Sequence, residues 1–473
     1  MRLLRLVCVL LVAGALALGI RAERASTGRP RPNVLLVSID SLRADHLGSY
    51  GYERPTSPTI DRLASEGALF EKAIAPAPWT VPSHMTMLTA LPPEVHGVTS
   101  HRKALSPAAV TLAEVLRRAG YATAAFVSGP TVMAHYGFAQ GFTVFDESTA
   151  ERDSYRSQTG ITSPALVELV GDYLEEWDRE GRRAPFFVFL HMWDVHYDYA
   201  PPAPFDRMFD PDYAGGMSFT DFERNQGIQP NMDPRDLQHL VALYDGEIRW
   251  TDENLGRVID RLRELGVLDD TIVVVTSDHG DEFFEHGLKG HSKTLYDEVL
   301  HVPLVVRYPR RIPFGRRVPE QVRLMDVAPT IVGLAGVEPP ERFGVDREEM
   351  PAPYGWVDLT PWIARRTPRA FAQELPAFSM ATALFGPQWS MRTNAGKLIR
   401  FASGRGAELY DLAHDPRERD NLYGSGNEGP LLQVLAPGFE DWQGIWKVLP
   451  ARAVERTPSR THEARLRALG YVE

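Results

Sequence analysis

The segment 278–281, Asp-His-Gly-Asp, has residue types that suit a metal site and follows an apolar run at 271–276. An Asp-His pair at the end of a buried strand offers an oxygen and a nitrogen ligand to one ion. A solvated acidic turn is the alternative interpretation. Asp40 ends a second apolar run, 33–39, and adds another oxygen ligand. Together these residues predict a divalent metal site.

The segment 79–84, Trp-Thr-Val-Pro-Ser-His, places the hydroxyl of Thr80 at a predicted helix start. Pro82 suits the first turn, where its missing N–H costs nothing. A metal ion and a helix N-terminus together can hold a threonine hydroxyl as an alkoxide. The pattern therefore favours Thr80 as a candidate nucleophile. The alternative is that Thr80 only caps the helix.

Apolar runs alternate with helical patterns along most of the chain. This order predicts a parallel sheet with helices on both faces, in which ligands bind beyond the carboxyl ends of the strands. Asp40, the group His191/Asp194/His196 and Asp278 all follow predicted strands, so we expect them at one edge. The predicted strands are 33–39, 124–127, 186–190, 271–276 and 302–306, and the predicted helices are 111–118, 163–179 and 236–265.

Two other regions differ from this pattern. Residues 200–235, rich in Pro, Asp, Asn and Gly, predict a long loop or lid over the ligand-binding edge. Short strand-like pieces at 389–392, 397–401 and 408–412 predict a small antiparallel sheet with a C-terminal helix. The predicted fold is thus an α/β, doubly wound, mostly parallel sheet with a smaller C-terminal α+β subdomain. We expect a catalytic domain over 33–350 and the subdomain over 351–473.

The composition and the N-terminus indicate where the protein works. A formal net charge of -11 argues against nucleic acid as a partner, because phosphate backbones need a basic surface. Arg2 and Arg5 precede an apolar run at 6–20, which predicts export to the periplasm or the extracellular space. Residues 1–22 are either a cleaved signal peptide or a membrane anchor, and 23–32 form a linker. Membrane contact is expected only for the uncleaved form. Cys8, the single cysteine, lies in this segment, so the mature chain would contain no disulfide.

An ordered set of motifs resembles the sulfatase family of the alkaline-phosphatase superfamily. These motifs are 32–40 (PNVLLVSID), 80–83 (TVPS), 276–280 (TSDHG) and 296–304 (YDEVLHVPL). Segments 326–330 and 408–412, with Asp415-Pro416, resemble later landmarks of the family. The resemblance extends from about residue 31 to 423. It implies the fold predicted above and an ester hydrolase with a metal centre.

The chain departs from the family pattern at the residues that act on sulfate. Thr80 occupies the position of the cysteine or serine that becomes formylglycine, and His84 that of the following arginine. Oxidation of threonine would give a ketone, so the aldehyde hydrate that attacks sulfate cannot form. Asp40 is followed by Ser41 in place of a second aspartate, and two cationic positions fall on the uncharged segment 127–130. The remaining set resembles phosphoethanolamine and phosphoglycerol transferases and phosphodiesterases.

The resemblance implies a role for each candidate residue. The expected activity is metal-dependent cleavage or transfer of a phosphate or sulfate ester through Thr80, with phosphoesters favoured. The alternatives are a sulfatase that uses unmodified threonine and an inactive binding protein with the same fold. The substrate would be a small anionic ester, such as a lipid or glycan headgroup. The expected ligands of one divalent ion (Mn, Zn, Mg or Ca) are Asp40, Thr80, Asp278 and His279; the catalytic residues are Thr80, His196 and His291; and the substrate-binding residues are His84, His101, His191 and Lys293.

Overall fold

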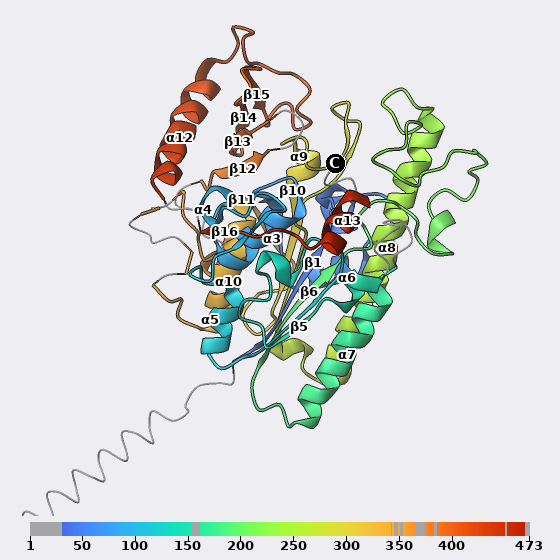
Figure 1. Cartoon of the computed structure of the whole chain (residues 1–473), viewed down its shortest axis with the longest axis vertical. Helices are drawn as coiled ribbons and strands as arrows, with labels where there is room; N and C mark the ends of the chain where they lie inside the picture. The colour runs from blue at the N-terminus through green and yellow to red at the C-terminus, as the bar shows by residue number, and fades with distance from the viewer. Residues whose placement is uncertain are drawn as a thin grey trace, which may run out of the picture. The chain divides into compact units, whose positions relative to one another are not determined.

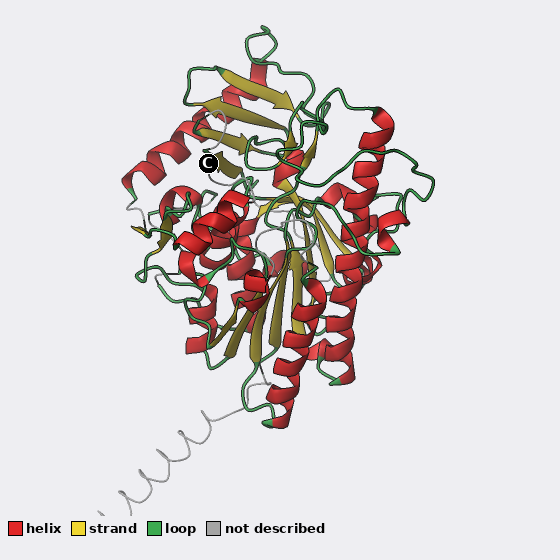
Figure 2. Cartoon of the chain, turned by 45° about the vertical axis from the view of Figure 1, so that its right-hand side comes forward, coloured by secondary structure: helices red, strands yellow, loops and turns green. Residues whose placement is uncertain are grey.

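A mixed sheet runs through the centre of the protein (Figures 1 and 2). In the described part of the chain it has eight strands in the order β11-β2-β10-β7-β1-β6-β4-β5. Neighbouring strands are parallel except at β10, which is antiparallel to both β7 and β2. The strands are β1 (Asn33–Ile39), β2 (Ala68–Ile74), β4 (Ala122–Val127), β5 (Val144–Asp146), β6 (Phe186–Met192), β7 (Thr271–Thr276), β10 (His301–Arg307) and β11 (Arg316–Arg323).

The computed structural model describes residues 31–152, 161–341, 343–344, 349–350, 353–364, 374–382, 386–449 and 452–468. The predicted signal or anchor at 1–22 and nearly all of the predicted linker at 23–32 lie outside these residues. Among the residues that the structure describes, no helix has both the length and the apolar character needed to cross a membrane.

Helices cover both faces of the sheet, as the nearly continuous apolar runs of its central strands require. Val34 and Leu36 of β1 belong to one hydrophobic cluster, with α3 (Thr80–Thr89), α5 (Leu112–Arg118) and α10 (Val327–Ala335). Leu35 and Val37 belong to a second cluster, with α2 (Pro58–Ser65), α7 (Ser163–Arg179) and α8 (Pro234–Glu264). In Figure 1 these two layers lie on opposite sides of the strands. The predicted doubly wound α/β fold is confirmed.

The helix boundaries follow local sequence signals. The Thr111 side chain accepts a hydrogen bond from the Glu114 backbone, and the Glu114 side chain accepts one from the Thr111 backbone. This capping box fixes the start of α5. Gly120 follows its end with a φ of 91°, a left-handed conformation that glycine adopts at little cost. The shorter elements are α4 (Pro93–His96), α6 (Ser148–Arg152), α9 (Asp297–Leu300), α11 (Thr360–Ile363), β8 (Glu282–Phe283) and β9 (Lys289–Gly290).

The C-terminal part contains a separate antiparallel sheet, as predicted. It consists of β12 (Ala377–Ala381), β13 (Gln388–Arg392), β14 (Gly396–Phe401) and β15 (Ala407–Asp411), and α12 (Gly429–Val448) packs against it. The chain then returns to the large part, where β16 (Ala453–Glu455) pairs with β3 (Lys103–Leu105) and α13 (Arg460–Ala468) follows. The predicted domain boundary at 350/351 stays a prediction.

The sheet register brings the predicted site residues together. β1 lies between β6 and β7 and is parallel to both. Ser38 of β1 is level with His191 on one side and Thr276 on the other. Asp40 and Asp278, each two residues further along its strand, therefore emerge at the same edge, beyond the carboxyl ends of the strands.

Candidate functional site

Asp40, Asp278 and His279 form a group of potential metal ligands at this edge. One ligand atom from each residue lies within 4.8 Å of those of the others, and all three residues are fully buried. Ser41 turns the chain after β1 with a φ of 56°. Its hydroxyl donates to Asp40 Oδ1 at 3.1 Å, and its amide donates to Asp278 Oδ1 at 3.3 Å. The residue that replaces the second aspartate thus orients the two remaining carboxylates.

The donor set fits a divalent cation. Burial raises the pKa of Asp40 to about 7, and burial together with nearby Asp40 raises the pKa of Asp278. Asp278 Oδ2 is enclosed and accepts no hydrogen bond from the described residues. Two buried carboxylates side by side are costly without a positive partner. A divalent ion between them would supply that charge and bind the enclosed oxygen.

His279 presents its Nε2 atom to this group. Its Nδ1 atom lies 3.1 Å from the Gly280 carbonyl, an arrangement that places the proton on Nδ1 and leaves Nε2 as the ligand atom. Nε2 lies 3.2 Å from Asp278 Oδ2. Burial opposes protonation of His279, but Asp278 and Asp40 outweigh it and raise the pKa of the imidazole.

Thr80 is the first residue of α3, and Trp79 is the N-cap residue. The Thr80 hydroxyl is fully buried and faces the ligand group, with Oγ1 3.4 Å from Asp40 Oδ2 and 3.3 Å from His279 Nε2. A hydroxyl that merely capped the helix would instead accept from the amides of the first turn. The geometry therefore favours the site interpretation of Thr80 over the capping interpretation.

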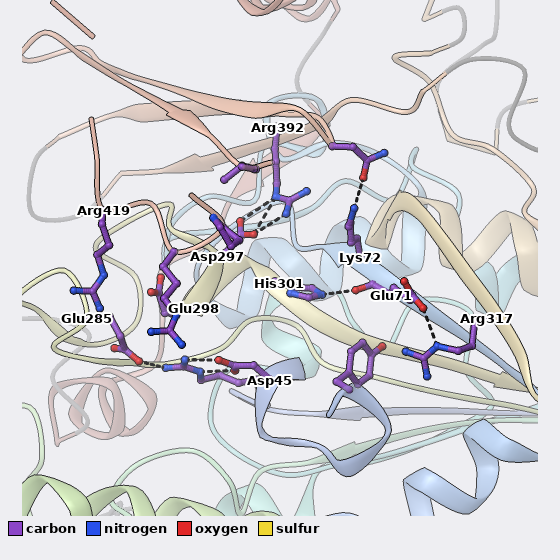
Figure 3. Close-up of a pocket in the computed structure, with 16 residues that line it drawn as sticks. Asp45, Glu71, Lys72, Glu285, Asp297, Glu298, His301, Arg317, Arg392 and Arg419 are labelled. Atoms are coloured by element: carbon purple, nitrogen blue, oxygen red, sulfur yellow. Dashed lines mark hydrogen bonds and ion pairs between the residues drawn. The ribbon is translucent and has the colours of Figure 1, made fainter. Parts of the chain in front are cut away.

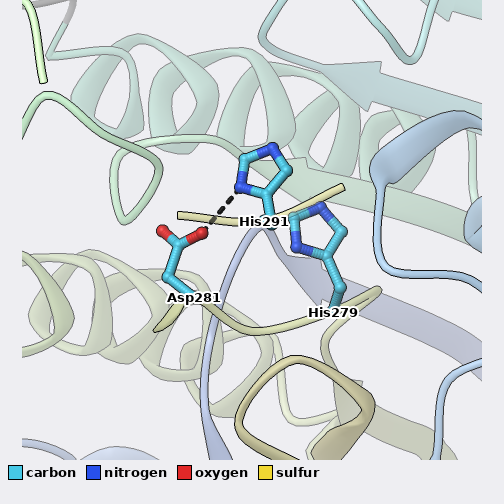
Figure 4. Close-up of side chains that lie close together, drawn as sticks. All are labelled: His279, Asp281 and His291. Atoms are coloured by element: carbon cyan, nitrogen blue, oxygen red, sulfur yellow. Dashed lines mark hydrogen bonds and ion pairs between the residues drawn. The ribbon is translucent and has the colours of Figure 1, made fainter. Parts of the chain in front are cut away.

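His291 lies beside the ligand group and is held by Asp281. His291 Nδ1 is 2.6 Å from Asp281 Oδ1, and the Tyr199 hydroxyl donates to Asp281 Oδ2 at 2.6 Å. Figure 4 shows the Asp281 carboxylate against His291, with the ring of His279 alongside. His279, Asp281 and His291 form a second group whose ligand atoms lie within 4.8 Å of one another. The two groups share His279, and a single Nε2 binds one ion at a time.

Asp281 belongs to the segment 278–281 that the sequence indicated, but it was assigned no role of its own, and Tyr199 was not among the predicted site residues. The position of Asp281, two residues after His279, was the available signal. Nothing in the sequence indicates Tyr199, because its contact with Asp281 joins residues 82 positions apart.

His196 lies next to His291, with ring centroids 5.0 Å apart. Its ring stacks on Trp193 at 3.8 Å, and its Nδ1 atom lies 2.6 Å from the Tyr197 carbonyl. Burial, with each histidine close to another, lowers the pKa of both His196 and His291 well below the usual value. The two imidazoles are therefore neutral at pH 7 in the metal-free chain.

His84 and His191 support the ligand group from behind. His84 Nδ1 lies 3.0 Å from the Thr80 carbonyl and Nε2 lies 2.8 Å from the Ser38 hydroxyl. His191 Nε2 lies 3.1 Å from Asp40 Oδ2. Burial lowers the pKa of His84 to about 3 and that of His191 to about 4. Both of these predicted substrate-binding residues are fully buried. In the structure, His84 contacts Thr80 and His191 contacts Asp40.

His101 and Lys293 contact residues other than the predicted metal ligands. His101 Nδ1 is 2.9 Å from the Tyr136 hydroxyl, and its ring packs edge-on against Trp79 at 5.1 Å. Lys293 Nζ lies 2.8 Å from the Glu223 carboxylate. Glu223 belongs to the loop predicted to act as a lid, so this ion pair attaches the loop to the segment that carries His291.

The uncharged segment at 127–130 is closed around Trp193. Gly129 has a φ of 77°, and a Cβ atom there would lie 2.2 Å from the Trp193 ring. The Ser128 hydroxyl donates to the His191 carbonyl at 3.1 Å. This corner therefore holds the Trp193–His196 stack where a sulfatase pattern would place cationic side chains.

Comparison with known proteins places the chain in a family. The sequence model of the Sulfatase family matches residues 32–337, more than half of the chain. The chain belongs to the sulfatase family. One curated relative, an N-acetylglucosamine-6-O-sulfatase of Bacteroides thetaiotaomicron, is 24% identical and aligns over 93% of this chain and 91% of its own. The mouse steryl-sulfatase is 28% identical over 70% of this chain and 66% of its own.

Solved structures show the same fold. One, in complex with D-glucosamine-2-N,6-O-disulfate, superposes with a TM-score of 0.73 at 22% identity, over 88% of this chain and 98% of the other. The phosphonate monoester hydrolase of Agrobacterium radiobacter gives a TM-score of 0.71 at 21% identity, over 90% of this chain and 100% of the other. This sulfatase-family protein is thus a hydrolase of sulfuric or phosphoric esters, in a family that depends on divalent metal ions.

Proposed function

We propose that this protein cleaves or transfers a phosphoester by in-line displacement at Thr80, with Asp40, Thr80, Asp278 and His279 holding one divalent ion. The observation that carries the proposal is the position of the Thr80 hydroxyl, 3.4 Å from Asp40 and 3.3 Å from His279, at the N-terminus of α3. A divalent ion in this group would lower the pKa of the hydroxyl and neutralise charge on the substrate.

The chain's own residues account for the remaining requirements of the displacement. A bond forms between Thr80 Oγ1 and phosphorus while the bond from phosphorus to the leaving oxygen breaks. Free amides of the first turn of α3 suit the anionic group. His196 and His291 would donate hydrogen bonds to the non-bridging oxygens or, in the protonated form, protonate the leaving oxygen. Water or an alcohol then takes the group from Thr80.

Several departures from the sulfatase pattern favour phosphoesters. An unmodified threonine cannot supply the aldehyde hydrate, and the segment at 127–130 lacks cationic side chains. A sulfuric ester hydrolase that uses unmodified Thr80 is the second candidate, because the curated relatives described above are sulfatases. An inactive binding protein is less consistent with the two buried carboxylates of Asp40 and Asp278, whose pKa values burial raises and which are costly to hold together unless they serve a ligand.

A direct comparison of substrates tests the proposal. Protein loaded with Mn²⁺, Zn²⁺, Mg²⁺ or Ca²⁺ is assayed side by side with four substrates: an aryl phosphate, an aryl phosphodiester, an aryl phosphonate monoester and an aryl sulfate. Fastest turnover of a phosphorus ester is expected. An acid quench should add the mass of a phosphoryl group to the peptide that contains Thr80. Turnover confined to aryl sulfate would favour the second candidate, and no turnover with any metal would favour the binding protein.

We also propose that the protein is exported and acts on the anionic headgroup of a lipid or glycan. The apolar run at 6–20 after Arg2 and Arg5 supports export. N-terminal sequencing of the protein from its native host should find a start between about residues 18 and 26. An intact Met1 on protein from the cytoplasm would contradict export.

A further inference from the structure

A second cavity lies outside the candidate catalytic site. It has a volume of about 620 Å³ and lies between the large sheet and the C-terminal sheet (Figure 3). Its lining comes from β2, β10 and β11, from α9 and the segments that follow β1 and β8, and from β13 with the loops after β13 and β15. That lining includes neither the predicted metal ligands nor the predicted catalytic residues Thr80, His196 and His291. The volume is in the range of sites for small molecules.

The carboxylates in this cavity are largely neutralised by arginines of the protein. Arg43 pairs with Asp45 at 2.8 Å and with Glu285 at 2.6 Å. Arg392 pairs with Asp297 at 2.7 Å, as Figure 3 shows. Two further lining carboxylates also have basic partners: Glu71 lies 2.7 Å from Arg317, and Glu298 lies 3.5 Å from His286. The acidic side chains therefore leave little negative charge for an incoming cation.

Three cations of the lining remain without an acidic partner among the described residues. Within the described ranges, Lys72 Nζ donates to the side chain of Asn394, at 2.8 Å, and to no other residue. Arg417 and Arg419 are exposed and form no ion pair with the described part of the chain. Guanidinium and ammonium groups that face a cavity without a carboxylate partner suit the oxygens of sulfate or phosphate esters.

The rest of the lining indicates the kind of molecule that carries the anion. Tyr50, Leu412 and Pro416 are its main apolar side chains, and the other residues are charged or polar. A lipid chain would meet only these three apolar side chains among many charged groups, whereas a sugar can use its hydroxyls against carboxylates and amides. A hydrophilic, anionic sugar matches both the volume of this cavity and the charged and polar side chains that line it.

One wall of this cavity is the back of the metal-ligand loop. Arg43 Nη1 donates to the Asp281 carbonyl at 2.8 Å, and the Gly280 amide donates to the Val299 carbonyl at 2.8 Å. A Cβ atom on Gly280 would lie 2.2 Å from the Glu298 carbonyl oxygen and 2.8 Å from Arg43 Cγ. The loop 278–281 thus separates two neighbouring sites, with predicted ligands on one side and the charged cavity on the other.

We propose that this cavity is an accessory site that binds a sugar carrying a sulfate or phosphate ester, through Lys72, Arg417 and Arg419. The proposal does not rest on the reaction at Thr80. An anionic sugar held there lies beside the catalytic centre without entering it. The bound sugar is either part of a longer anionic glycan or a separate small molecule.

Binding is measured by calorimetry on the full chain carrying Thr80→Ala, so that turnover does not consume the probe. The probes are a sulfated glucosamine disaccharide, its desulfated counterpart, glucosamine 6-phosphate and inorganic sulfate. The triple variant carries Lys72→Ala, Arg417→Ala and Arg419→Ala. It should bind the sulfated disaccharide at least about tenfold more weakly than its parent. The control is Arg102→Ala/Arg117→Ala/Arg118→Ala, which removes three exposed cations elsewhere and should bind as the parent does.

The remaining outcomes separate the possible ligands and the two proposals. Tight binding of glucosamine 6-phosphate alongside the disaccharide supports a small-molecule ligand, and binding of the disaccharide alone supports a glycan chain. Equal binding of the sulfated and desulfated sugars, or equal affinity in the triple variant and its control, would overturn the proposal. In protein that keeps Thr80, the three substitutions should leave turnover of small aryl esters within about twofold of wild type, because none of them touches the predicted catalytic residues. This measurement separates the accessory site from the proposed reaction.

Discussion

The Nδ1 atom of His291 lies 2.6 Å from Oδ1 of Asp281, and the side chains of both residues are fully enclosed. This contact fixes the orientation of the imidazole beside the ligand group, as carboxylates do for histidines in metal sites. The Tyr199 hydroxyl holds the other carboxylate oxygen at 2.6 Å. The position of His291 therefore depends on two residues that need not contact the substrate.

Asp281→Asn should lower kcat by about 10- to 100-fold while the protein stays folded. An amide has one oxygen and cannot accept hydrogen bonds from both His291 and Tyr199. Tyr199→Phe removes only the outer contact and should have a smaller effect. Metal content per chain, measured by mass spectrometry, should not change in either variant. Loss of the bound ion from Asp281→Asn would instead show that Asp281 is needed to hold it.

Asp278→Ala and His279→Ala should each remove the bound ion and the activity, because both residues belong to the predicted ligand set. The fold should survive, since neither side chain contributes to the apolar clusters. Circular dichroism and metal analysis check this expectation. Metal-free Asp278→Ala should be at least as stable as metal-free wild type, because it removes a buried carboxylate next to Asp40. Unfolded variants would instead show that the pair is structural.

Metal affinity should fall as the pH is lowered. Burial raises the pKa of Asp40 to about 7 in the metal-free chain, so near pH 7 a proton competes with the ion. Above this pKa the carboxylate is ionised and binds the ion freely. At lower pH the proton must leave first, so binding at pH 6 should be about tenfold weaker than at pH 8. Calorimetry in buffers with different ionisation enthalpies measures the proton released. Affinity independent of pH over this range would contradict the expectation.

Glu94→Gln should increase stability at alkaline pH. Both carboxylate oxygens of Glu94 are enclosed without a hydrogen bond from another described residue, although the side chain as a whole is half-buried. Burial raises its pKa from 4.5 to about 8. Below pH 4.5 the group is protonated in both the folded and unfolded states. As the pH rises towards 8, only the unfolded chain ionises, and the free energy of unfolding falls.

The stabilisation by Glu94→Gln should thus be about 2–4 kcal/mol greater at pH 8 than at pH 4.5. Urea unfolding at the two pH values measures this difference. Glu53→Gln, at an exposed glutamate, is the matched control and should show little change between them. An equal effect of Glu94→Gln at both pH values would mean that this carboxylate is solvated in the folded state.

The sequence predicted the central strands because their apolar runs stop at polar residues. The runs before Asp40 and Asp278 correspond to β1 and β7, with the predicted boundaries. Since parallel strands end at a common edge, the ligand group followed from the topology. β2 was not predicted, because Glu71 and Lys72 interrupt its apolar pattern. The antiparallel direction of β10 was not predicted either, because hydrophobic periodicity carries no information on strand direction.

The sequence could not predict contacts that depend on the tertiary fold. Tyr199 reaches Asp281 across 82 residues, and His84 contacts Ser38 across 46. The pairing of β16 with β3 joins segments that are far apart in the sequence, Ala453–Glu455 and Lys103–Leu105. The roles assigned to His101 and Lys293 came from the family resemblance, and their contacts with Tyr136 and Glu223 do not test those roles. Their substrate contacts stay predictions.

Thr80 gives the most direct test of the proposed chemistry. Thr80→Ala should abolish turnover of every ester, because no other hydroxyl contacts both Asp40 and His279 in the described residues. Thr80→Ser keeps the hydroxyl and should retain appreciable activity. Thr80→Cys should be slow with phosphoesters, since a thiolate is a soft ligand at a site built from carboxylates and imidazole.

The matched control for these variants is Thr89→Ala, which changes a buried threonine of the same helix whose hydroxyl donates to the Met85 carbonyl at 2.6 Å. It should retain metal and most of the activity. Thr80→Ala should fold normally and bind the substrate, so its loss should be in kcat rather than in KM. A phosphoryl adduct should be found on the wild-type Thr80 peptide and be missing from the Thr80→Ala peptide. Near wild-type turnover by Thr80→Ala with any ester would exclude the covalent mechanism and favour attack by a metal-bound hydroxide.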